Sequence, residues 1–156
     1  MIIYKNIEEY FDSNTNNKKQ VFVIDLIVYN KWRNRIKSIL NNQPFITIES
    51  TEKKKSMKTY NTIIEFLFEN KINRDYTLYA IGGGIVGDIS GFVSSTFMRG
   101  IKLVHVPTTL LSMVDSSIGG KTGINNIYGK NMIGSIYQAK DILVDYTWLE
   151  TLPKKH

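Results

Sequence analysis

The sequence predicts an α/β fold: a Rossmann-like, mostly parallel sheet with helices on both faces. Short apolar runs rich in β-branched residues alternate with longer segments of helical apolar spacing, which is typical of βαβ units. One of these runs is followed directly by the glycines at 82–84, where a strand would turn into a helix. The 156 residues suit one domain, which we place over residues 1–156.

Five segments are expected to be strands, because each is a short apolar run bounded by polar or turn-forming residues. They are residues 21–25, 45–48, 76–81, 102–106 and 141–145. In parallel sheets of this kind, ligands bind beyond the carboxyl ends of the strands. The glycines at 82–84, Pro107-Thr108-Thr109 and the segment after Asp145 all lie at such ends, so we expect the functional site there.

The first two helices are expected between these strands. Asn30 is a suitable cap for a helix that continues to Leu40 and stops before Pro44. Ser56 is a suitable cap for a second helix over residues 57–68. The polar residues 14–19 are expected to form a surface loop.

Two more helical segments are expected further along the chain. One runs from the glycines at 82–84 to about Phe97, and the other begins at about Thr108. Gly91 inside the first costs about 1 kcal/mol relative to alanine, which indicates that another element approaches closely there. Residues 125–128 are turn formers and should form a loop.

Composition narrows the class of protein. There is no cysteine, which excludes disulfides and thiolate metal sites. The formal net charge is +6, but the lysines are spread out and no nucleic-acid-binding motif accompanies them. A lysine-rich surface with a site for an acidic small molecule therefore explains the charge better than nucleic-acid binding. No apolar run is long enough to cross a membrane and no signal peptide is recognisable, so a cytoplasmic protein without a membrane partner is expected.

The first glycine stretch has the pattern of a phosphate site. Gly82, Gly84 and Gly87 fit G-x-G-x-x-G between a strand and a helix, where backbone N–H groups can bind a pyrophosphate. The acidic residue expected about 20 positions later is missing, so this is not the ordinary dinucleotide fingerprint. Tight packing of helix on strand is the alternative reason for the glycines. Asp88 is either an acid favoured by the helix dipole or an acceptor for a sugar hydroxyl.

The second glycine stretch, residues 119–123, resembles the tail of a P-loop but lacks G-x-x-x-x-G-K-[ST], which disfavours a Walker-type nucleotidase. We expect a mobile glycine loop that presents Lys121. Lys130 and Arg99 also stand beside glycines. Three such cations converging on one cleft would bind phosphate and carboxylate groups, and the alternative is three solvated surface cations.

Two further titratable residues have open interpretations. Asp115 follows an apolar stretch and is either a cap for the next turn or a site residue aimed into the cleft. His105 sits within an apolar strand and is a core or strand-end residue rather than a catalyst.

Taken together, these motifs closely resemble 3-dehydroquinate synthase. The resemblance is nearly free of gaps from about Tyr76 to Pro153, and Glu52-Lys53-Lys54-Lys55 preserves the family's Glu-x-x-Lys upstream. The motifs that carry it, in order, are Gly82-Gly83-Gly84-Ile85-Val86-Gly87-Asp88, Met98-Arg99-Gly100, Pro107-Thr108-Thr109-Leu110-Leu111, Val114-Asp115-Ser116-Ser117-Ile118-Gly119-Gly120-Lys121-Thr122-Gly123, Gly129-Lys130-Asn131 and Leu149-Glu150-Thr151-Leu152-Pro153.

The resemblance implies a lyase of the shikimate pathway, and so of aromatic amino acid biosynthesis. The family converts 3-deoxy-arabino-heptulosonate 7-phosphate, a sugar phosphate, into 3-dehydroquinate with elimination of phosphate. A tightly held NAD oxidises a ring hydroxyl and later returns the hydride, while a divalent metal, zinc or cobalt, polarises that hydroxyl. The family's dimer makes a homodimer a candidate assembly.

The resemblance also assigns residues to the NAD site. Departures from the family's polar pattern at Leu26 and Ile27 weaken the assignment at the adenosine end. The implied cofactor-binding residues are Asp25 at the adenine ribose, Glu52 and Lys55 on the adenosine side, Gly83, Gly84, Gly87 and Asp88 at the pyrophosphate and ribose, Thr108, Thr109 and Lys130 along the nicotinamide half, and Lys121, Leu149 and Thr151 beside them.

Four residues are implied for the substrate. Asp115, Lys121 and Asn131 would face it, and Arg99 would reach the substrate phosphate in a neighbouring subunit's site. The family's metal ligands lie in a C-terminal helical domain, which this sequence does not contain, so none is expected here. The chain is then truncated relative to a two-domain family and inactive alone, with a separate C-terminal polypeptide as a candidate partner.

Other functions remain open on the sequence. A non-catalytic nucleotide-binding module would share the glycine stretches, and another sugar-phosphate cyclase would share most of these motifs. Metal-dependent polyol or alcohol dehydrogenases are disfavoured, because they usually continue from Gly-Gly-Gly with serine, whereas Ile85-Val86-Gly87-Asp88 follows here.

Overall fold

A six-stranded sheet, parallel between all neighbours, organises the molecule. The computed structural model describes residues 1–14 and 19–152. In spatial order the strands are β1 (Ile2–Tyr4), β8 (Asp141–Val144), β5 (Lys102–Pro107), β4 (Thr77–Gly82), β2 (Gln20–Asp25) and β3 (Phe45–Ile48). The five predicted strands are confirmed, and β1 is a sixth that the sequence analysis missed.

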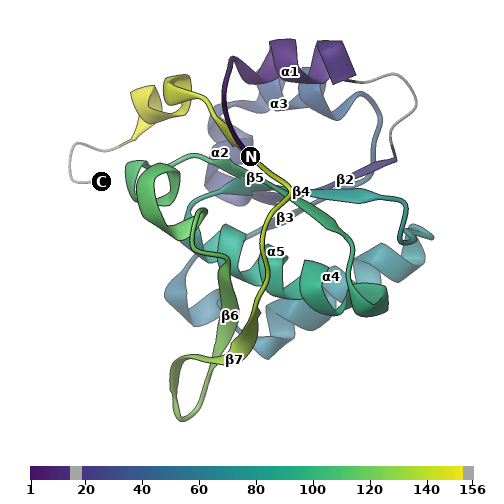
Figure 1. The fold of residues 1–156 in the computed structure, drawn as a ribbon, viewed down its shortest axis with the longest axis vertical. Coiled ribbons are helices and arrows are strands. Elements are labelled where there is room, and N and C mark those ends of the chain that lie inside the picture. The colour runs from purple at the N-terminus through teal and green to yellow at the C-terminus, as the bar shows by residue number, and fades with distance from the viewer. Residues whose placement is uncertain (15–18, 153–156) are drawn as a thin grey trace.

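Helices cover both faces of the sheet, as predicted (Figure 1). On one face lie α1 (Ile7–Asn14), α2 (Leu26–Lys31) and α3 (Arg33–Leu40), and on the other lie α4 (Met57–Glu69) and α5 (Gly84–Thr96). Two hydrophobic clusters correspond to these faces, one with Ile7 and Ile36 from α1 and α3, the other with Ile63 and Ile89 from α4 and α5. Because the sheet is buried on both sides, its central strands are continuously apolar rather than alternating.

Side-chain caps mark the starts of α2 and α4, and one of the two predicted caps is wrong. Ser56 caps α4 by accepting a hydrogen bond from the Thr59 N–H, as expected. The expected cap at Asn30 is wrong, because Asn30 lies inside α2. The Asp25 carboxylate caps α2 instead, accepting from the N–H groups of Ile27 (2.7 Å) and Val28 (3.3 Å).

The segment after β5 is helical, as predicted. The helix begins at Leu110 and passes at once into the π-helical turn η3 (Ser112–Ser116), a widening that the sequence did not indicate. The Ser117 hydroxyl donates to the Ser112 carbonyl (2.6 Å), which stabilises this widened turn. This helical segment brings both Thr109 and Ser116 close to the start of α5.

An antiparallel hairpin of β6 (Lys121–Asn126) and β7 (Gly129–Ile136) projects below the sheet in the view of Figure 1. The mobile glycine loop expected at 119–123 is therefore wrong from Lys121 onward. Gly123 pairs directly with Gly134, and a Cβ at Gly134 would come within 2.0 Å of the Thr122 carbonyl oxygen. These glycines exist for close backbone packing, not for mobility.

The loop expected at 125–128 is shorter than predicted, because β6 continues to Asn126. The polar loop expected at 14–19 lies mostly outside the described residues, as do the last four residues of the chain. Among the helices of the described part, none is long and apolar enough to cross a membrane.

Gly91 lies where α5 contacts β6, which confirms the expected close approach. A Cβ at Gly91 would come within 2.3 Å of the Thr122 Cγ2 atom and 3.0 Å of the Thr122 Cβ atom. We expect Gly91→Ala to lower the free energy of unfolding by about 1–2 kcal/mol, because this overlap outweighs the better helix propensity of alanine. Urea unfolding of the variant measures this difference.

Thr122→Ser in the Gly91→Ala background should recover part of that loss. Serine removes the Cγ2 methyl group but keeps the hydroxyl that donates to the Ser135 carbonyl (2.8 Å). A Gly91→Ala variant that is more stable than the parent chain would contradict the packing explanation.

Candidate functional site

Two cavities open beyond the carboxyl ends of the strands. The first, which we call the strand-end cavity, has a volume of about 370 Å³, and the second, the hairpin cavity, has about 540 Å³. The strand-end cavity is lined by Asp25, Ile27, Val28, Lys31, Trp32, Ser50, Gly83, Gly84, Ile85, Thr108, Thr109, Trp148, Thr151 and Leu152. The hairpin cavity is lined by Asp88, Asp115, Ser116, Gly119, Lys121, Thr122, Gly123, Asn131, Met132, Gly134, Ser135 and Ile136.

The strand-end cavity lies where the order of the strands reverses. After β2 the chain forms β3 on one side of it and then β4 on the other, so the connections leave β2 in opposite directions. Such a reversal opens a crevice at the strand ends, and it is the usual ligand position in sheets of this type. Asp25, Ser50, Gly83 and Thr108 come from the ends of four strands and meet in this crevice.

The glycines at the start of α5 give this cavity an anion-binding character. Gly83 is the N-cap of α5, and no side chain caps this end by a hydrogen bond. A Cβ at Gly83 would lie 3.2 Å from the Thr109 Cγ2 atom, and one at Gly84 would lie 3.1 Å from the Ser116 Oγ atom. The missing side chains let the backbone lie close to the 108–116 segment, and the first N–H groups of α5 stay available to a phosphate.

The Asp25 carboxylate is fixed at the opposite side of the strand-end cavity. It is nearly buried, and besides capping α2 it accepts a hydrogen bond from the Ser50 hydroxyl. Ser50 follows β3 and was not predicted from the sequence. A carboxylate held in this way is a preorganised acceptor for hydroxyl groups.

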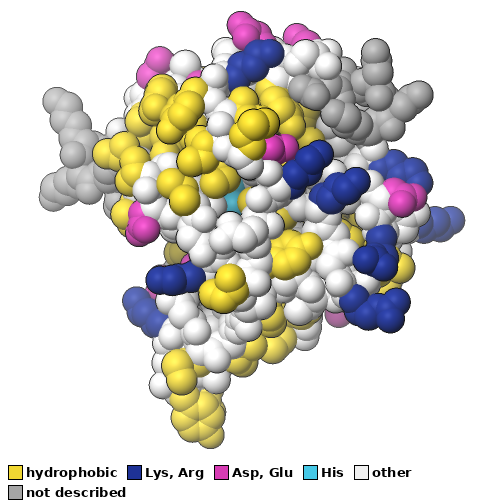
Figure 2. Space-filling view, in the orientation of Figure 1, with side chains coloured by type: hydrophobic (Ala, Val, Ile, Leu, Met, Phe, Trp, Pro, Cys, Tyr) yellow, Lys and Arg dark blue, Asp and Glu magenta, His cyan; other side chains and the backbone are white. Residues whose placement is uncertain are grey.

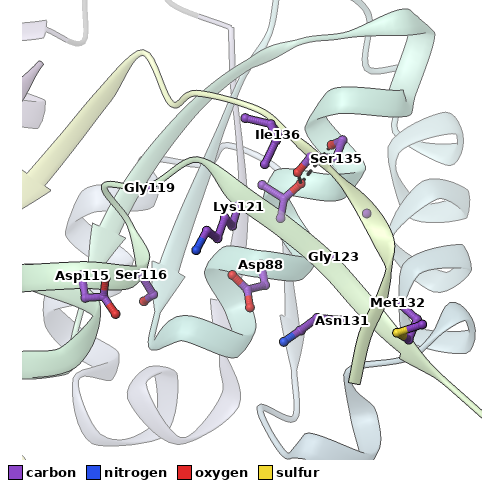
Figure 3. Close-up of a pocket in the computed structure, with 12 residues that line it drawn as sticks. Asp88, Asp115, Ser116, Gly119, Lys121, Gly123, Asn131, Met132, Ser135 and Ile136 are labelled. Carbon is purple, nitrogen blue, oxygen red and sulfur yellow. Dashed lines mark hydrogen bonds between the residues drawn. The ribbon is translucent and has the colours of Figure 1, made fainter. Parts of the chain in front are cut away.

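The hairpin cavity gathers charged side chains from three elements (Figure 3). Asp88 comes from α5, Asp115 from η3 and Lys121 from β6, and their side chains face a common space with Asn131 from β7. Lys121 and Asp115 are exposed to solvent in this space. One cation among acids and amides suits a ligand that carries both anionic and hydroxyl groups.

A buried lysine anchors one side of the hairpin cavity. Lys55 is 4% exposed, and its ammonium group forms an ion pair with Asp88 and donates a hydrogen bond to the Asn131 side-chain oxygen. Burial raises the pKa of the Asp88 carboxyl above its usual value, while the Lys55 ammonium acts in the opposite direction. Asn131 has a left-handed backbone conformation (φ 57°), which asparagine tolerates better than most residues.

Glu52 and Lys130 lie outside both cavities. The Asn125 side-chain amide donates to the Glu52 carboxylate (2.7 Å), and the Lys130 ammonium stands 3.8 Å from it. The hydrogen bond from Asn125 and the charges of Lys130 and Lys55 outweigh a small effect of burial and lower the pKa of Glu52. The two residues therefore brace the hairpin against the turn at 52–54.

The two cavities are neighbours at Gly84 and Ser116. Gly84 lines the strand-end cavity, Ser116 lines the hairpin cavity, and both line a much smaller space between them. A ligand that fills the strand-end cavity and extends past Gly84 would reach Asp88 and Lys121. The geometry thus supports one extended ligand beside a second, smaller one.

Four residues predicted for the site line neither large cavity, besides Glu52 and Lys130. Gly87 contacts His105, and Leu149 packs on the core. Lys55 acts through its partners, as above. The Arg99 side chain is exposed beyond the carboxyl end of α5, at the opposite end of this helix from Gly84.

His105 is buried in β5, where its interpretation as a core residue is confirmed. Burial lowers the pKa of the imidazole to about 4. At neutral pH it is therefore an uncharged group that packs beneath the glycine stretch.

Residues that the sequence analysis did not single out also line the strand-end cavity, notably Lys31, Trp32 and Trp148. The sequence carried no signal for Trp32, because the expected helix continued through it, whereas in the structure it stands between α2 and α3. Within residues 1–14 and 19–152, no three or more His, Cys, Asp or Glu side chains lie close enough together to hold a metal ion.

Comparisons with known proteins point to one family. A sequence model described as "3-dehydroquinate synthase N-terminal" matches residues 45–156. The 3-dehydroquinate synthase of Pelagibacter ubique is 43% identical over 158 residues, which cover 98% of this chain and 42% of that protein. That of Buchnera aphidicola subsp. Cinara cedri is 52% identical over 117 residues, 75% of this chain and 32% of that protein.

A solved structure has the same fold. The 2-epi-5-epi-valiolone synthase of Streptomyces hygroscopicus subsp. jinggangensis 5008, solved with NAD⁺ and Zn²⁺ bound, superposes with a TM-score of 0.91 at 26% identity. The match covers 100% of this chain and 45% of that one. The chain thus spans less than half the length of these three proteins.

Proposed function

The chain belongs to the 3-dehydroquinate synthase family, and from this premise we propose that it is the NAD-binding part of such an enzyme. The complete enzyme would form 3-dehydroquinate from 3-deoxy-arabino-heptulosonate 7-phosphate and release phosphate. Because the chain covers only 42% of the Pelagibacter relative, this activity is proposed for the chain together with a part that corresponds to the rest of that relative. Alone it would bind NAD and show no turnover.

The observation that carries the proposal is the pair of neighbouring cavities, with a small space lined by Gly84 and Ser116 between them. The strand-end cavity offers a carboxylate at Asp25 and an uncapped helix N-terminus at Gly83. These groups suit a ribose diol and a pyrophosphate, and the apolar walls between them suit a planar ring. NAD therefore fits the residues present, and when bound it supplies the hydride acceptor and donor for the reaction.

The hairpin cavity is the proposed place of the sugar phosphate. Lys121 provides the positive charge for its anionic groups, while Asp115 and Asn131 offer hydrogen-bond partners for its hydroxyl groups. Lys55 holds Asp88 and Asn131 in place from beneath. A sugar phosphate in this cavity would lie beside Ser116, next to Gly84, and would meet the end of the cofactor that leaves the strand-end cavity.

We propose that the remaining part of the enzyme docks beside these cavities and supplies the metal. Leu110, Leu111, Val114 and Ile118 are 52%, 67%, 62% and 40% exposed and form an apolar stripe on the segment that lines both cavities. Figure 2 shows apolar side chains gathered on that side of the molecule. Exposed apolar side chains gathered at the rim of a site are typical of a protein interface.

The choice among cyclases rests on sequence identity. The valiolone synthase shares the fold but is 26% identical, whereas the two 3-dehydroquinate synthases are 43% and 52% identical over the matched residues. We therefore propose the shikimate substrate in preference to another sugar phosphate. A cytoplasmic location, a homodimer and a cross-subunit role for Arg99 are parts of the same proposal.

A complementation experiment tests the function. The chain is mixed with a polypeptide that covers the part of the Pelagibacter relative beyond the match, and phosphate release is measured with substrate, NAD and Zn²⁺. We expect release from the mixture and none from the chain alone. NAD binding without turnover in any mixture would favour a non-catalytic nucleotide-binding module, and turnover by the chain alone would contradict the division of the site.

The stripe is tested in the same assay with a matched pair of variants. Leu111→Ser with Val114→Ser should abolish complementation while leaving NAD binding by the chain intact. The control is Ile127→Ser at the hairpin tip, which is also exposed but lies outside the stripe. Equal loss in both variants would contradict docking at the stripe.

A further inference from the structure

Two consecutive residues of this chain reach across the strand-end cavity to a third that lies 119 or more positions away. The Trp32 Nε1 atom donates to the Thr151 hydroxyl (3.0 Å), and the Lys31 ammonium donates to the Thr151 carbonyl oxygen (2.8 Å). All three residues line the cavity. We call this set of contacts the 31–32/151 clasp.

Trp148 and Arg35 hold the indole of Trp32 in position. Trp32 stands at the break between α2 and α3, and its ring meets the buried ring of Trp148 edge to face, with centroids 5.4 Å apart. The Arg35 guanidinium lies over both rings, 5.2 Å from the centroid of Trp32 and 4.4 Å from that of Trp148. A ring fixed by these contacts loses little conformational entropy when a ligand in the cavity binds to it.

Apolar side chains line the cavity beside this ring. Ile27 and Val28 from α2, Ile85 from α5 and Leu152 complete the apolar part of the wall. The polar groups lie at its margins, with the Asp25 carboxylate on one side and the amides of α5 on another. An apolar slot bordered by a hydroxyl acceptor and a phosphate site has the chemistry of a purine nucleotide site.

We propose that Trp32 forms the wall against which the planar base of the dinucleotide stacks, and that the 31–32/151 clasp holds this wall in place. The inference rests on the proposed binding of NAD and adds to it the residue that holds the adenine half. It also accounts for Lys31 and Trp32, to which the sequence motifs assigned no role. Trp32 binds the ligand directly, and Thr151 acts through Trp32.

Binding titrations with two halves of the cofactor test the inference. Affinities of the whole chain for NADH, ADP-ribose and reduced nicotinamide mononucleotide are measured by calorimetry and by tryptophan emission. The chain contains two tryptophans, and both line this cavity, so emission reports binding directly. Trp32→Ala should weaken NADH and ADP-ribose binding about ten- to hundredfold and leave the mononucleotide unchanged.

Three further variants separate stacking from stability. Trp32→Phe keeps an aromatic face and should recover most of the affinity, whereas Thr151→Val, which removes only the hydroxyl acceptor, should weaken binding a few-fold. Tyr128→Ala at the exposed hairpin tip is the control and should change nothing. Circular dichroism of each variant verifies folding.

The outcomes separate this inference from the proposed function. If the unmodified chain binds NADH and Trp32→Ala binds ADP-ribose equally well, the role of Trp32 is overturned and the NAD site stands. Equal weakening of all three ligands would also overturn it, because it would mean a general loss of structure. If the unmodified chain binds none of the ligands, both proposals fall together.

Discussion

Replacement of Lys55 by methionine is expected to lower the free energy of unfolding by about 3–5 kcal/mol, the usual cost of breaking a buried ion pair. Methionine fills a similar volume, but the Asp88 carboxylate, whose side chain is 23% exposed, then loses its cation. Asn131 loses its donor as well, so the start of β7 should loosen. Urea unfolding at pH 7 measures the loss.

The pH dependence of this variant gives a second, independent readout. Burial already holds the pKa of Asp88 above its usual value in the folded chain, and without Lys55 nothing opposes this effect. A carboxyl with a raised pKa binds its proton more tightly when folded, so stability rises as the pH falls toward the unfolded value. The difference in free energy of unfolding between the unmodified chain and Lys55→Met should therefore become smaller as the pH is lowered from 7 to 5.

A double variant controls for packing. Lys55→Met combined with Asp88→Leu removes both charges and should recover most of the loss, because no charge is left buried without a partner. A deficit that stays constant with pH, or a double variant as unstable as the single one, would contradict the role of charge.

Replacement of Arg35 by methionine is expected to lower the free energy of unfolding by about 3 kcal/mol, the second large effect. The guanidinium binds the Glu8 carboxylate (2.8 Å) and the Asp145 carboxylate (2.6 Å), and it donates to the Thr147 hydroxyl (2.6 Å). It thereby connects α1 and α3 to η4 (Tyr146–Thr151), which lines the strand-end cavity. Arg33→Met, an exposed change on the same helix, should cost less than about 0.5 kcal/mol.

Asp145 determines how this effect varies with pH. Burial would raise the pKa of Asp145, but hydrogen bonds from Thr147 and from the Ile7 N–H, together with the charge of Arg35, lower it. A carboxyl with a lowered pKa adds stability above its unfolded value of about 3.9, and this is lost as the pH falls through the folded value. The difference between the unmodified chain and Arg35→Met should therefore shrink below about pH 4. A difference that grows in acid would contradict this account.

The sequence predicted the parallel sheet because its central strands are buried on both faces and so read as continuous apolar runs, as at Val21 to Ile24. It did not reveal β1, whose three residues are too few to show any period. The helix α1 was also not predicted, although its sequence shows helical spacing: Ile7 and Phe11 are four positions apart, and both are buried. Asn6 accepts hydrogen bonds from the Glu8 and Glu9 N–H groups at the start of this helix.

The two cavities could be anticipated only in part. Glycine motifs indicated Gly83, Gly84 and Lys121, because a glycine that allows close approach of the backbone and a lysine beside it can both be recognised from neighbouring residues in the sequence. The β6–β7 hairpin was missed because its glycines make room for the backbone of the opposite strand. Neighbouring residues in the sequence do not show such a requirement. Trp32 and Ser50 were missed for a related reason: both act across distances along the chain that only the folded molecule brings together.

The pairing of β1 with β8 has a consequence for how the protein is made. Tyr4 lies opposite Val144, so β1 has no neighbouring strand until β8, far along the chain, has been made. At about 5–20 residues per second, β1 waits on the order of ten seconds for its partner strand. Pairings between such distant segments also slow the search for the native state. Phe11 can pack on Phe22 and Tyr79 as soon as β2 and β4 have been made, whereas the Ile7 N–H obtains its partner, the Asp145 carboxylate, only at the same late stage as β1.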